Sequence, residues 1–281
     1  MTFSTKPRKR FGQHWLCSEA ILSKIIAAAE LEDHDRVLEI GPGTGVLTQR
    51  LLEKVAQVVA IEIDRDLCRK LEKQFAAANN FVLWQGDILQ VDLEQPFSNY
   101  TGLSLPNKVV ANIPYYITGP ILEKLLGTLS NPQRPPFDSI VLLVQQEIAE
   151  RLSATSGTKA FGGLSVKVQY LAECDVICLV PPKAFQPPPK VTSAVIRLRP
   201  RQLLPKAENP KLLLQLVNLG FASKRKMLRN NLVSLIERSR LLSLLAELDI
   251  SENVRAEDLS VAHWVALSNK ILKEPSFLPD G

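Results

Sequence analysis

The pattern of hydrophobic and polar positions changes part-way along the chain. Through the first half, short apolar runs alternate with amphipathic segments, which predicts strands alternating with helices. The predicted strands are residues 36–40, 57–63, 81–85, 108–111 and 139–144. The predicted helices are residues 18–30, with Ser18 as a candidate N-cap, 46–54, 65–75 and 119–129. This alternation predicts a doubly wound α/β fold around a mainly parallel sheet.

The alternation of predicted strands and helices ends after the fifth predicted strand. Residues 154–163 are polar and contain glycine, so they predict a loop. Two late strands, 172–179 and 192–198, are joined through a proline-rich stretch and suit an antiparallel hairpin at one edge of the sheet. From about Asn209 onward, leucines recur at helical spacing. We therefore predict a first domain of residues 1–205 and a small helical domain of residues 206–281.

The composition fits a folded protein with a modest positive charge. Hydrophobic residues make up 46% of the 281, which supports a packed core, and the formal net charge of +5 favours an acidic partner without requiring one. The chain has neither the layout of a secretory signal nor an uncharged run of membrane-spanning length, so we expect a cytoplasmic protein. The four cysteines form no disulfide framework and lack close zinc ligands, so we expect free thiols.

A glycine-rich turn follows the first predicted strand. Gly41, Gly43 and Gly45 lie in VLEIGPGTG (37–45), just before a predicted helix. Glycine lets the backbone approach a ligand, and the start of a helix offers free N–H groups. A nicotinamide dinucleotide site needs Gly or Ala at the sixth position of G-x-G-x-x-G, where this chain has Val46. The turn therefore favours S-adenosylmethionine over a dinucleotide.

Acidic residues follow the next two predicted strands. Glu62 lies about 20 residues beyond the glycine turn, where a ribose-binding acid is expected. A carboxylate can accept hydrogen bonds from both ribose hydroxyls, but strand alternation puts Asp64 on the same face and leaves it as a rival. Asp87, after the third strand, is placed to accept a hydrogen bond from an adenine amino group. Candidate ligand-binding residues at the ends of three successive predicted strands thus predict a cofactor site.

The fourth predicted strand is followed by Asn112-Ile113-Pro114-Tyr115. An exocyclic amine of a nucleobase is a poor nucleophile because its lone pair is delocalised into the ring. The Asn112 amide oxygen, with the carbonyl of Ile113 or Pro114, can accept from both N–H groups and localise that lone pair. Tyr115 offers an aromatic face for the base. In-line methyl transfer to such a nitrogen demands proximity and orientation, and it needs no metal.

The chain resembles the small-subunit ribosomal RNA adenine dimethyltransferases, the KsgA-type family, over almost its whole length. The segments that carry the resemblance are KRFGQHWL (9–16), EIGPGTGVLT (39–48), VVAIEIDRDL (58–67), GDIL (86–89), NIPYYIT (112–118), VQQEIAERL (144–152) and FQPPPKVTSAVIRL (185–198). The resemblance implies a Rossmann-like class I methyltransferase fold with a small C-terminal helical domain. It also implies methyl transfer from S-adenosylmethionine to N6 of two adjacent adenines near the 3′ end of small-subunit rRNA, during ribosome biogenesis.

The resemblance also implies roles for individual residues. The implied cofactor contacts are His14, Leu16, Gly41, Glu62, Asp87 and Asn112. The residues implied to handle the target base are Asn112, Tyr115 and Phe185, with Phe185 stacking on the face of the base opposite Tyr115. The family usually has Asn where this chain has His14. Because histidine can donate or accept a hydrogen bond, we expect the contact to persist with altered geometry.

Three clusters of basic residues are candidates for contacts with RNA phosphates. They are Lys6, Arg8, Lys9 and Arg10; Arg197, Arg199 and Arg201; and Lys224, Arg225, Lys226 and Arg229. The second cluster shares one face if its strand continues, and the third lies on a predicted helix of the small domain. Together, around a base pocket, they predict a phosphate track. The target base has to reach that pocket unstacked or flipped.

Other functions fit parts of the pattern. A large-subunit rRNA adenine methylase of the resistance type shares the glycine turn and NIPY, but the C-terminal similarity and FQPPPKVTSA favour the small-subunit enzyme. A non-catalytic RNA-binding assembly protein would have lost a pocket residue, and a small-molecule methyltransferase would leave the basic clusters unexplained. We therefore predict a monomeric enzyme that acts on small-subunit rRNA or the immature small subunit, with S-adenosylmethionine as methyl donor and neither a metal nor a membrane partner.

Overall fold

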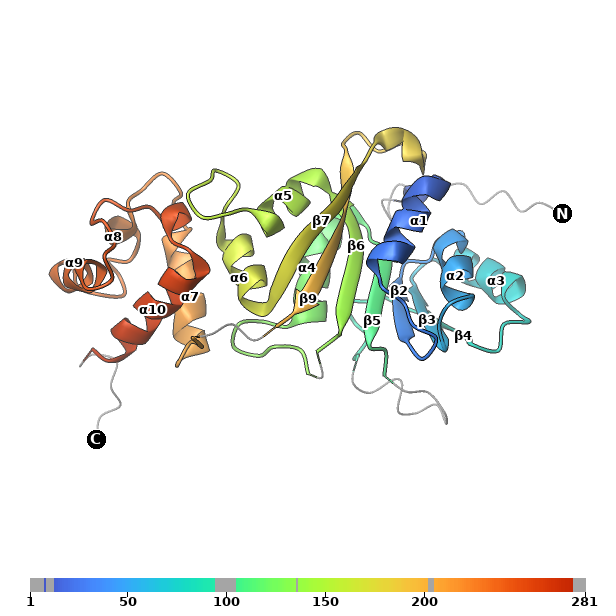
Figure 1. Cartoon of the computed structure of the whole chain (residues 1–281), viewed down its shortest axis with the longest axis horizontal. Helices are drawn as coiled ribbons and strands as arrows, with labels where there is room; N and C mark the ends of the chain where they lie inside the picture. Colours follow the sequence, from blue (N-terminus) through green and yellow to red (C-terminus); the bar gives the residue numbers. More distant parts are fainter. Residues whose placement is uncertain (1–7, 9–12, 94–104, 135, 202–204, 275–281) are drawn as a thin grey trace. The chain divides into compact units, whose positions relative to one another are not determined.

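The computed structural model describes residues 8, 13–93, 105–134, 136–201 and 205–274 (Figure 1). Its centre is a seven-stranded sheet with the strand order β4-β3-β2-β5-β6-β9-β7. The strands are β2 (Arg36–Ile40), β3 (Gln57–Glu62), β4 (Phe81–Gln85), β5 (Lys108–Asn112), β6 (Ser139–Gln145), β7 (Ala172–Val180) and β9 (Ser193–Pro200). Strands β2 to β6 pair in parallel, and β9 runs antiparallel to β6 with β7 beyond it at the edge. The predicted α/β fold and its antiparallel edge are confirmed.

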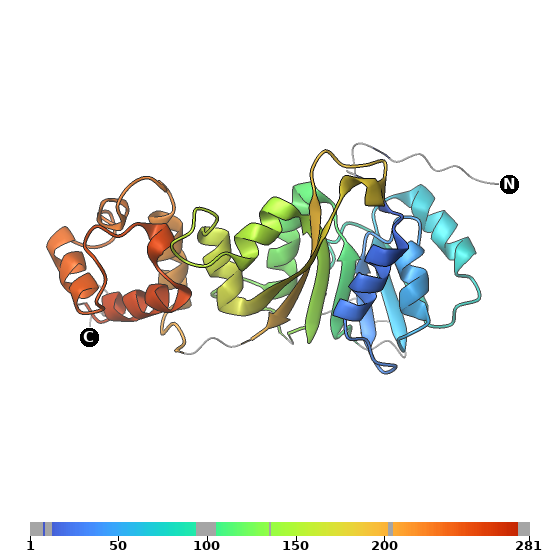
Figure 2. The same ribbon diagram turned by 45° about the horizontal axis from the view of Figure 1, so that its top comes forward.

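Helices cover both faces of this sheet. They include α1 (Glu19–Ala28), α2 (Val46–Leu52), α3 (Arg65–Gln74) and α4 (Thr118–Leu126). Between β6 and β7 the chain forms two more helices, α5 (Gln146–Ser153) and α6 (Gly163–Leu171). One core cluster joins α1 and α2 to strand residues such as Val37, Val58, Val110 and Val195. Figures 1 and 2 show α1, α2 and α3 on one face of the sheet and α4 on the other. The central strands β2, β3, β5 and β6 are buried on both sides, which is why they are almost continuously apolar.

The order of the strands places the carboxyl ends of β2 and β5 side by side. From β2 the chain proceeds outward to β3 and β4, and it then returns to start β5 on the other side of β2. Such a reversal opens a crevice beyond the strand ends, where α/β sheets bind ligands. A second, two-stranded sheet pairs β1 (Trp15–Leu16) with β8 (Phe185–Gln186) and so ties the N-terminal segment to the loop before β9.

The structure contains two compact units, which differ from the two continuous domains that we predicted. The first unit comprises Met1–Leu125, Pro135–Ala149 and Cys174–Pro200, and the second comprises Leu126–Arg134, Glu150–Glu173 and Arg201–Gly281. The break after Pro200 lies close to the predicted boundary. The second unit nevertheless includes two earlier segments of the chain. One of them contains α6, which packs against helices from the end of the chain. Those helices, orange to red in Figure 2, are α7 (Pro210–Gly220), α8 (Leu228–Asn231), α9 (Arg238–Ala246) and α10 (Val261–Leu272).

The ends of several helices differ from the sequence prediction. Ser18 does occupy the N-cap of α1, but its side chain makes no capping hydrogen bond. Helix α4 ends at Leu126 rather than at residue 129, because Gly127 adopts a φ of 77° that few other residues tolerate. Helices α5 and α6 were not predicted. No helix in the described ranges is both long and apolar enough to span a bilayer.

Candidate active site

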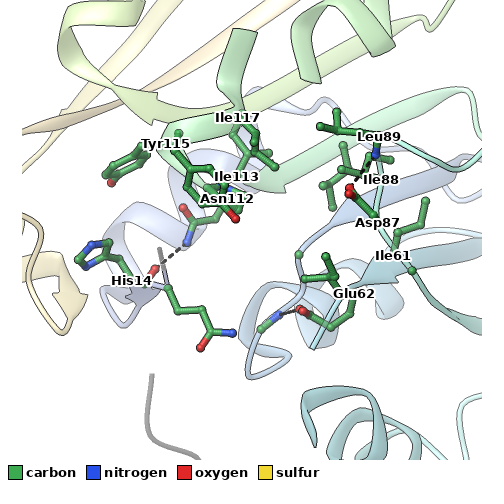
Figure 3. A pocket seen from close by; sticks show the side chains of 18 of the residues that line it. His14, Ile61, Glu62, Asp87, Ile88, Leu89, Asn112, Ile113, Tyr115 and Ile117 are labelled. Carbon is green, nitrogen blue, oxygen red and sulfur yellow. Dashed lines mark hydrogen bonds between the residues drawn. The ribbon is translucent and has the colours of Figure 1, made fainter. Parts of the chain in front are cut away.

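A pocket opens at the carboxyl ends of β2, β3, β4 and β5, within the first compact unit (Figure 3). Its lining residues come from four strand ends and from the segment that leads into β1. They include six of the eight residues predicted to contact the cofactor or the base, which are His14, Gly41, Glu62, Asp87, Asn112 and Tyr115. Figure 3 shows Glu62 and Asp87 on one side of Asn112, and His14 and Tyr115 on the other.

Gly41 and Gly43 of the glycine turn line this pocket. Gly41, Gly43 and Gly45 all have positive φ values, of 66°, 60° and 82°, in the left-handed region that glycine tolerates best. At Gly45 the space is also full, because a Cβ atom would lie 2.8 Å from the Phe75 ring. The turn therefore requires glycine for both backbone conformation and packing.

Glu62 lies at the end of β3 with its carboxylate held by two backbone groups. The N–H of Asp64 donates to Oε1 at 2.8 Å, and the N–H of Gly43 donates to Oε2 at 3.3 Å. A carboxylate has about four acceptor positions, so two remain for a ligand. Burial raises the pKa of Glu62, and the two N–H groups oppose that rise.

Asp64, the alternative to Glu62 as the ribose-binding acid, makes different contacts. Its side chain accepts from the Asp66 N–H and caps α3, and it also pairs with Arg8 at 3.0 Å. It does not line the pocket. The structure thus separates two acids that strand alternation could not, and it favours Glu62 as the ribose acceptor.

Asp87 follows β4 and lies across the pocket from Asn112 (Figure 3). Its Oδ1 accepts from the Leu89 N–H at 2.9 Å, which fixes the turn, and its other oxygen has no hydrogen-bond partner among the described residues. Ile63 and Ile88 line the same end of the pocket, and Ile63 is 46% exposed. Sequence reasoning missed these two apolar residues, although each directly follows or adjoins a predicted acidic ligand.

Asn112 ends β5, and one hydrogen bond sets the orientation of its amide. The Nδ2 group donates to the backbone carbonyl of His14 at 3.1 Å, drawn as a dashed line in Figure 3. Because the nitrogen is engaged there, the amide oxygen is left for a ligand in the pocket. An acceptor aimed into the pocket is what an amine substrate requires.

Tyr115 and His14 form the aromatic wall of the pocket. Their rings are nearly parallel, at 15°, with centroids 6.0 Å apart. The Tyr115 hydroxyl lies 2.6 Å from Ser193 Oγ, and burial raises the pKa of Tyr115. His14 Nδ1 lies 2.8 Å from the Pro187 carbonyl oxygen. Since that oxygen can only accept, Nδ1 carries the hydrogen and donates it.

Two predicted residues lie away from this pocket. Leu16 is 6% exposed and lines a smaller adjoining pocket behind the glycine turn, together with Trp15, Gly41 and Asn112. Phe185 is 4% exposed and belongs to the hydrophobic core, because its strand pairs with β1 and sets it opposite Leu16. Phe185 does not line the pocket in this structure, and its stacking on the target base stays a prediction.

Glu39, inside β2, is a buried acid that sequence reasoning did not single out. It is 1% exposed and also lines the small pocket behind the glycine turn. Burial, together with the charge of the neighbouring Glu62, raises the pKa of Glu39 to about 8. Glu39 is therefore mainly neutral near pH 7.

The second basic cluster is neutralised by the protein itself. Arg197 pairs with Glu30 and with Asp175, and only 15% of its side chain is exposed. Arg199 pairs with the same Asp175 at 2.8 Å, and Arg201 pairs with Glu173 at 2.6 Å. Their contact with RNA phosphates stays a prediction, and in this structure the charges of Arg197 and Arg199 are paired with acids.

Three of the four residues of the third cluster are accessible in a turn rather than on a helix, whereas Arg229 lies in α8 and donates to the Glu252 carbonyl. Lys224, Arg225 and Lys226 are exposed in the turn between α7 and α8, and no carboxylate among the described residues pairs with them. Asn231 holds this turn by donating to the carbonyls of Gly220 and Ser223. Of the first cluster, Lys6, Lys9 and Arg10 lie outside the described residues, whereas Arg8 pairs with acids of the α3 segment.

Comparison with known proteins identifies the family. The model of the family described as "Ribosomal RNA adenine dimethylase" matches residues 4–273. The chain belongs to this family. A relative from Nostoc sp. strain PCC 7120, named "Ribosomal RNA small subunit methyltransferase A", is 60% identical over 264 residues, which cover 94% of this chain and 97% of the relative. A protein of the same name from Synechococcus elongatus is 56% identical over 260 residues, covering 92% and 93%.

Solved structures of the dimethylase type have the same fold. A dimethyladenosine transferase from Plasmodium falciparum superposes with a TM-score of 0.77 at 29% identity, covering 90% of this chain and 96% of that one. The 23S rRNA methyltransferase ErmE superposes with a TM-score of 0.72 at 25% identity, covering 92% and 99%. The class I methyltransferase fold inferred from the sequence is thereby confirmed.

Proposed function

We propose that this chain transfers methyl groups from S-adenosylmethionine to N6 of two adjacent adenines near the 3′ end of small-subunit rRNA, during ribosome assembly in the cytoplasm. The observation that carries the proposal is the amide of Asn112, whose nitrogen is engaged by His14 and whose oxygen is left for an amine. The names of relatives that are 56–60% identical support the choice of the small-subunit substrate.

The residues of the pocket fit S-adenosylmethionine. The glycine turn leaves room for a ligand beside the backbone, and Glu62 retains acceptor positions for the two ribose hydroxyls. Ile63 and Ile88 offer apolar contact to a planar base, and Asp87 can accept from its amino group. When bound, the cofactor supplies a methyl group on a positively charged sulfur.

Asn112 prepares the nitrogen that attacks. Its amide oxygen accepts one N–H of the adenine amine and favours a more pyramidal nitrogen, whose lone pair is less delocalised into the ring. With the cofactor bound, that lone pair would form the new N–C bond as the bond between the methyl group and the sulfur breaks. The nitrogen, now positively charged, strengthens its hydrogen bond to Asn112 and then releases a proton to water. The amide thus binds the transition state more tightly than the substrate.

Tyr115 positions the base on which this chemistry occurs. Its ring is fixed by the hydroxyl contact with Ser193 and by the neighbouring ring of His14. A base that stacks on a fixed ring is held in one plane, and in-line transfer depends on such alignment. We assign Tyr115 to this role and leave Phe185 to the core, where its burial places it.

The proposal is tested by the choice of RNA. Purified protein is incubated with S-adenosylmethionine labelled on the methyl group and with small subunits from cells that lack the enzyme. Naked large-subunit rRNA serves as the competing substrate. We expect N6,N6-dimethyladenine in the small-subunit rRNA, located by mass spectrometry. Because ErmE, which shares this fold, is a 23S rRNA methyltransferase, modification of large-subunit rRNA alone would reject our proposal in favour of that activity.

A further inference from the structure

Tyr116, the residue next to the base-stacking Tyr115, lies at the mouth of the active-site pocket. It lines the pocket and yet is 61% exposed. Tyr115, by contrast, is half-buried and held by Ser193. Large aromatic side chains are normally used to bury apolar area, so one left exposed at a pocket rim is a candidate binding surface.

The backbone holds Tyr116 in a fixed place. Residues Tyr115–Ile117 form a single 3₁₀ turn that runs directly into α4. Thr118 Oγ1 donates to the Tyr115 carbonyl at 3.1 Å, and the side chain of Thr118 is buried. Pro114, which precedes the turn, has its φ fixed by its ring. A rigid ring loses little conformational entropy when a planar ligand stacks on it.

We propose that Tyr116 is a second base platform, which stacks the nucleotide adjacent to the adenine that occupies the pocket. This inference rests on the proposed function, in which the substrate contains two adjacent adenines. When one adenine enters the pocket, its neighbour loses a stacking partner and lies at the pocket mouth. Tyr116 replaces that partner, and because every base has a π-face, the platform accepts either adenine in turn.

The test uses a short RNA with adjacent purines in which the neighbour of the target adenine is replaced by 2-aminopurine, a base whose fluorescence is quenched by stacking. The full-length protein is compared with Tyr116→Phe and Tyr116→Ala. Leu179→Ala is a matched control, because Leu179 is 55% exposed in the same compact unit but does not line the pocket. Calorimetry with the cofactor alone shows whether each variant keeps an intact pocket.

We expect wild type, Tyr116→Phe and Leu179→Ala to keep the probe quenched and to bind the RNA equally. Tyr116→Ala should release the quenching and weaken RNA binding by roughly five- to hundredfold, as loss of one stacked base would, with cofactor affinity unchanged. Quenching and affinity that survive in Tyr116→Ala, while the wild type methylates RNA normally, would overturn this inference alone. Failure of the wild type to methylate any RNA would overturn the proposed function together with it.

Discussion

Replacing Asn112 by alanine removes two contacts at once. The amide nitrogen no longer donates to the His14 carbonyl, a bond of 3.1 Å in this structure, and the amide oxygen no longer faces the adenine amine. The first loss leaves a carbonyl of the pocket wall without its partner. The second loss removes the acceptor that favours an attacking nitrogen. Both changes act on the methyl-transfer step, whereas Glu62 and the glycine turn, which we propose hold the cofactor, are untouched.

The size of the effect follows from these contacts. A hydrogen bond to a group that becomes charged contributes roughly 1.5–3 kcal/mol, which is about 10- to 150-fold in rate. The amine is also less well oriented once the pocket wall relaxes, and orientation has a large effect on in-line transfer. We therefore expect turnover to fall by about 100-fold or more. Cofactor affinity should change by only a few-fold.

Single-turnover methyl transfer with saturating RNA measures the chemical step, and calorimetry measures cofactor binding. Asn107→Ala is the matched control, since Asn107 precedes the other end of β5. Its amide is equally engaged there, donating to Asp35 at 2.7 Å and to Asp138 at 2.8 Å. That variant should lose thermal stability and retain turnover per folded molecule. A folded Asn112→Ala protein that turns over within tenfold of the wild type would refute the role of the amide.

Three further predictions concern the cofactor, the pH dependence of stability and RNA binding. Glu62→Gln should weaken cofactor binding roughly 10- to 100-fold by calorimetry, since it loses charged acceptors for the ribose; an unchanged affinity would contradict this role. Burial raises the pKa of Glu39 from 4.5 to about 8, so the native protein retains a proton that the unfolded chain releases. The contribution of this proton to the free energy of unfolding is complete below pH 4.5 and is lost as the pH rises through 8. Glu39→Gln should therefore make the free energy of unfolding less dependent on pH over that window. Parallel pH profiles for the variant and the wild type would count against this account of Glu39. Replacing Lys224, Arg225 and Lys226 by glutamine should weaken RNA binding and reduce, by about two, the slope of the logarithm of the RNA-binding constant against the logarithm of salt concentration. An unaltered slope would show that these residues make no contact with RNA phosphates.

Most of the sheet could be predicted from the sequence. Its central strands are buried on both faces, so they form apolar runs that stand out between amphipathic helices. The ends of helices were harder to place, because they depend on single residues such as Gly127 at the end of α4. Helices α5 and α6 were missed, since each directly adjoins a strand without an intervening turn. The segment 150–173 joins the second compact unit through long-range packing, which no local pattern encodes.

The residues of the candidate site could be predicted where a single candidate ligand-binding residue lies at the end of a strand. Gly41, Glu62, Asp87 and Asn112 follow successive strands, and the parallel sheet brings them to one edge. Side-chain direction was not predictable. The sequence could not show that Phe185 would be buried by the pairing of β8 with β1. For the arginines of β9, charge pattern alone cannot tell a phosphate ligand from an ion pair, and here acids from distant segments have paired with them.

The position of His14 shows how a departure from the family pattern is accommodated. Its contact with Asn112 uses the backbone carbonyl, so it does not depend on which side chain occupies the position. The imidazole makes separate contacts, with the Pro187 carbonyl and with the Tyr115 ring. The backbone of this segment is in turn held by the pairing of β1 with β8. A histidine in place of asparagine therefore leaves the orientation of the Asn112 amide intact, and it adds an aromatic neighbour beside the Tyr115 ring.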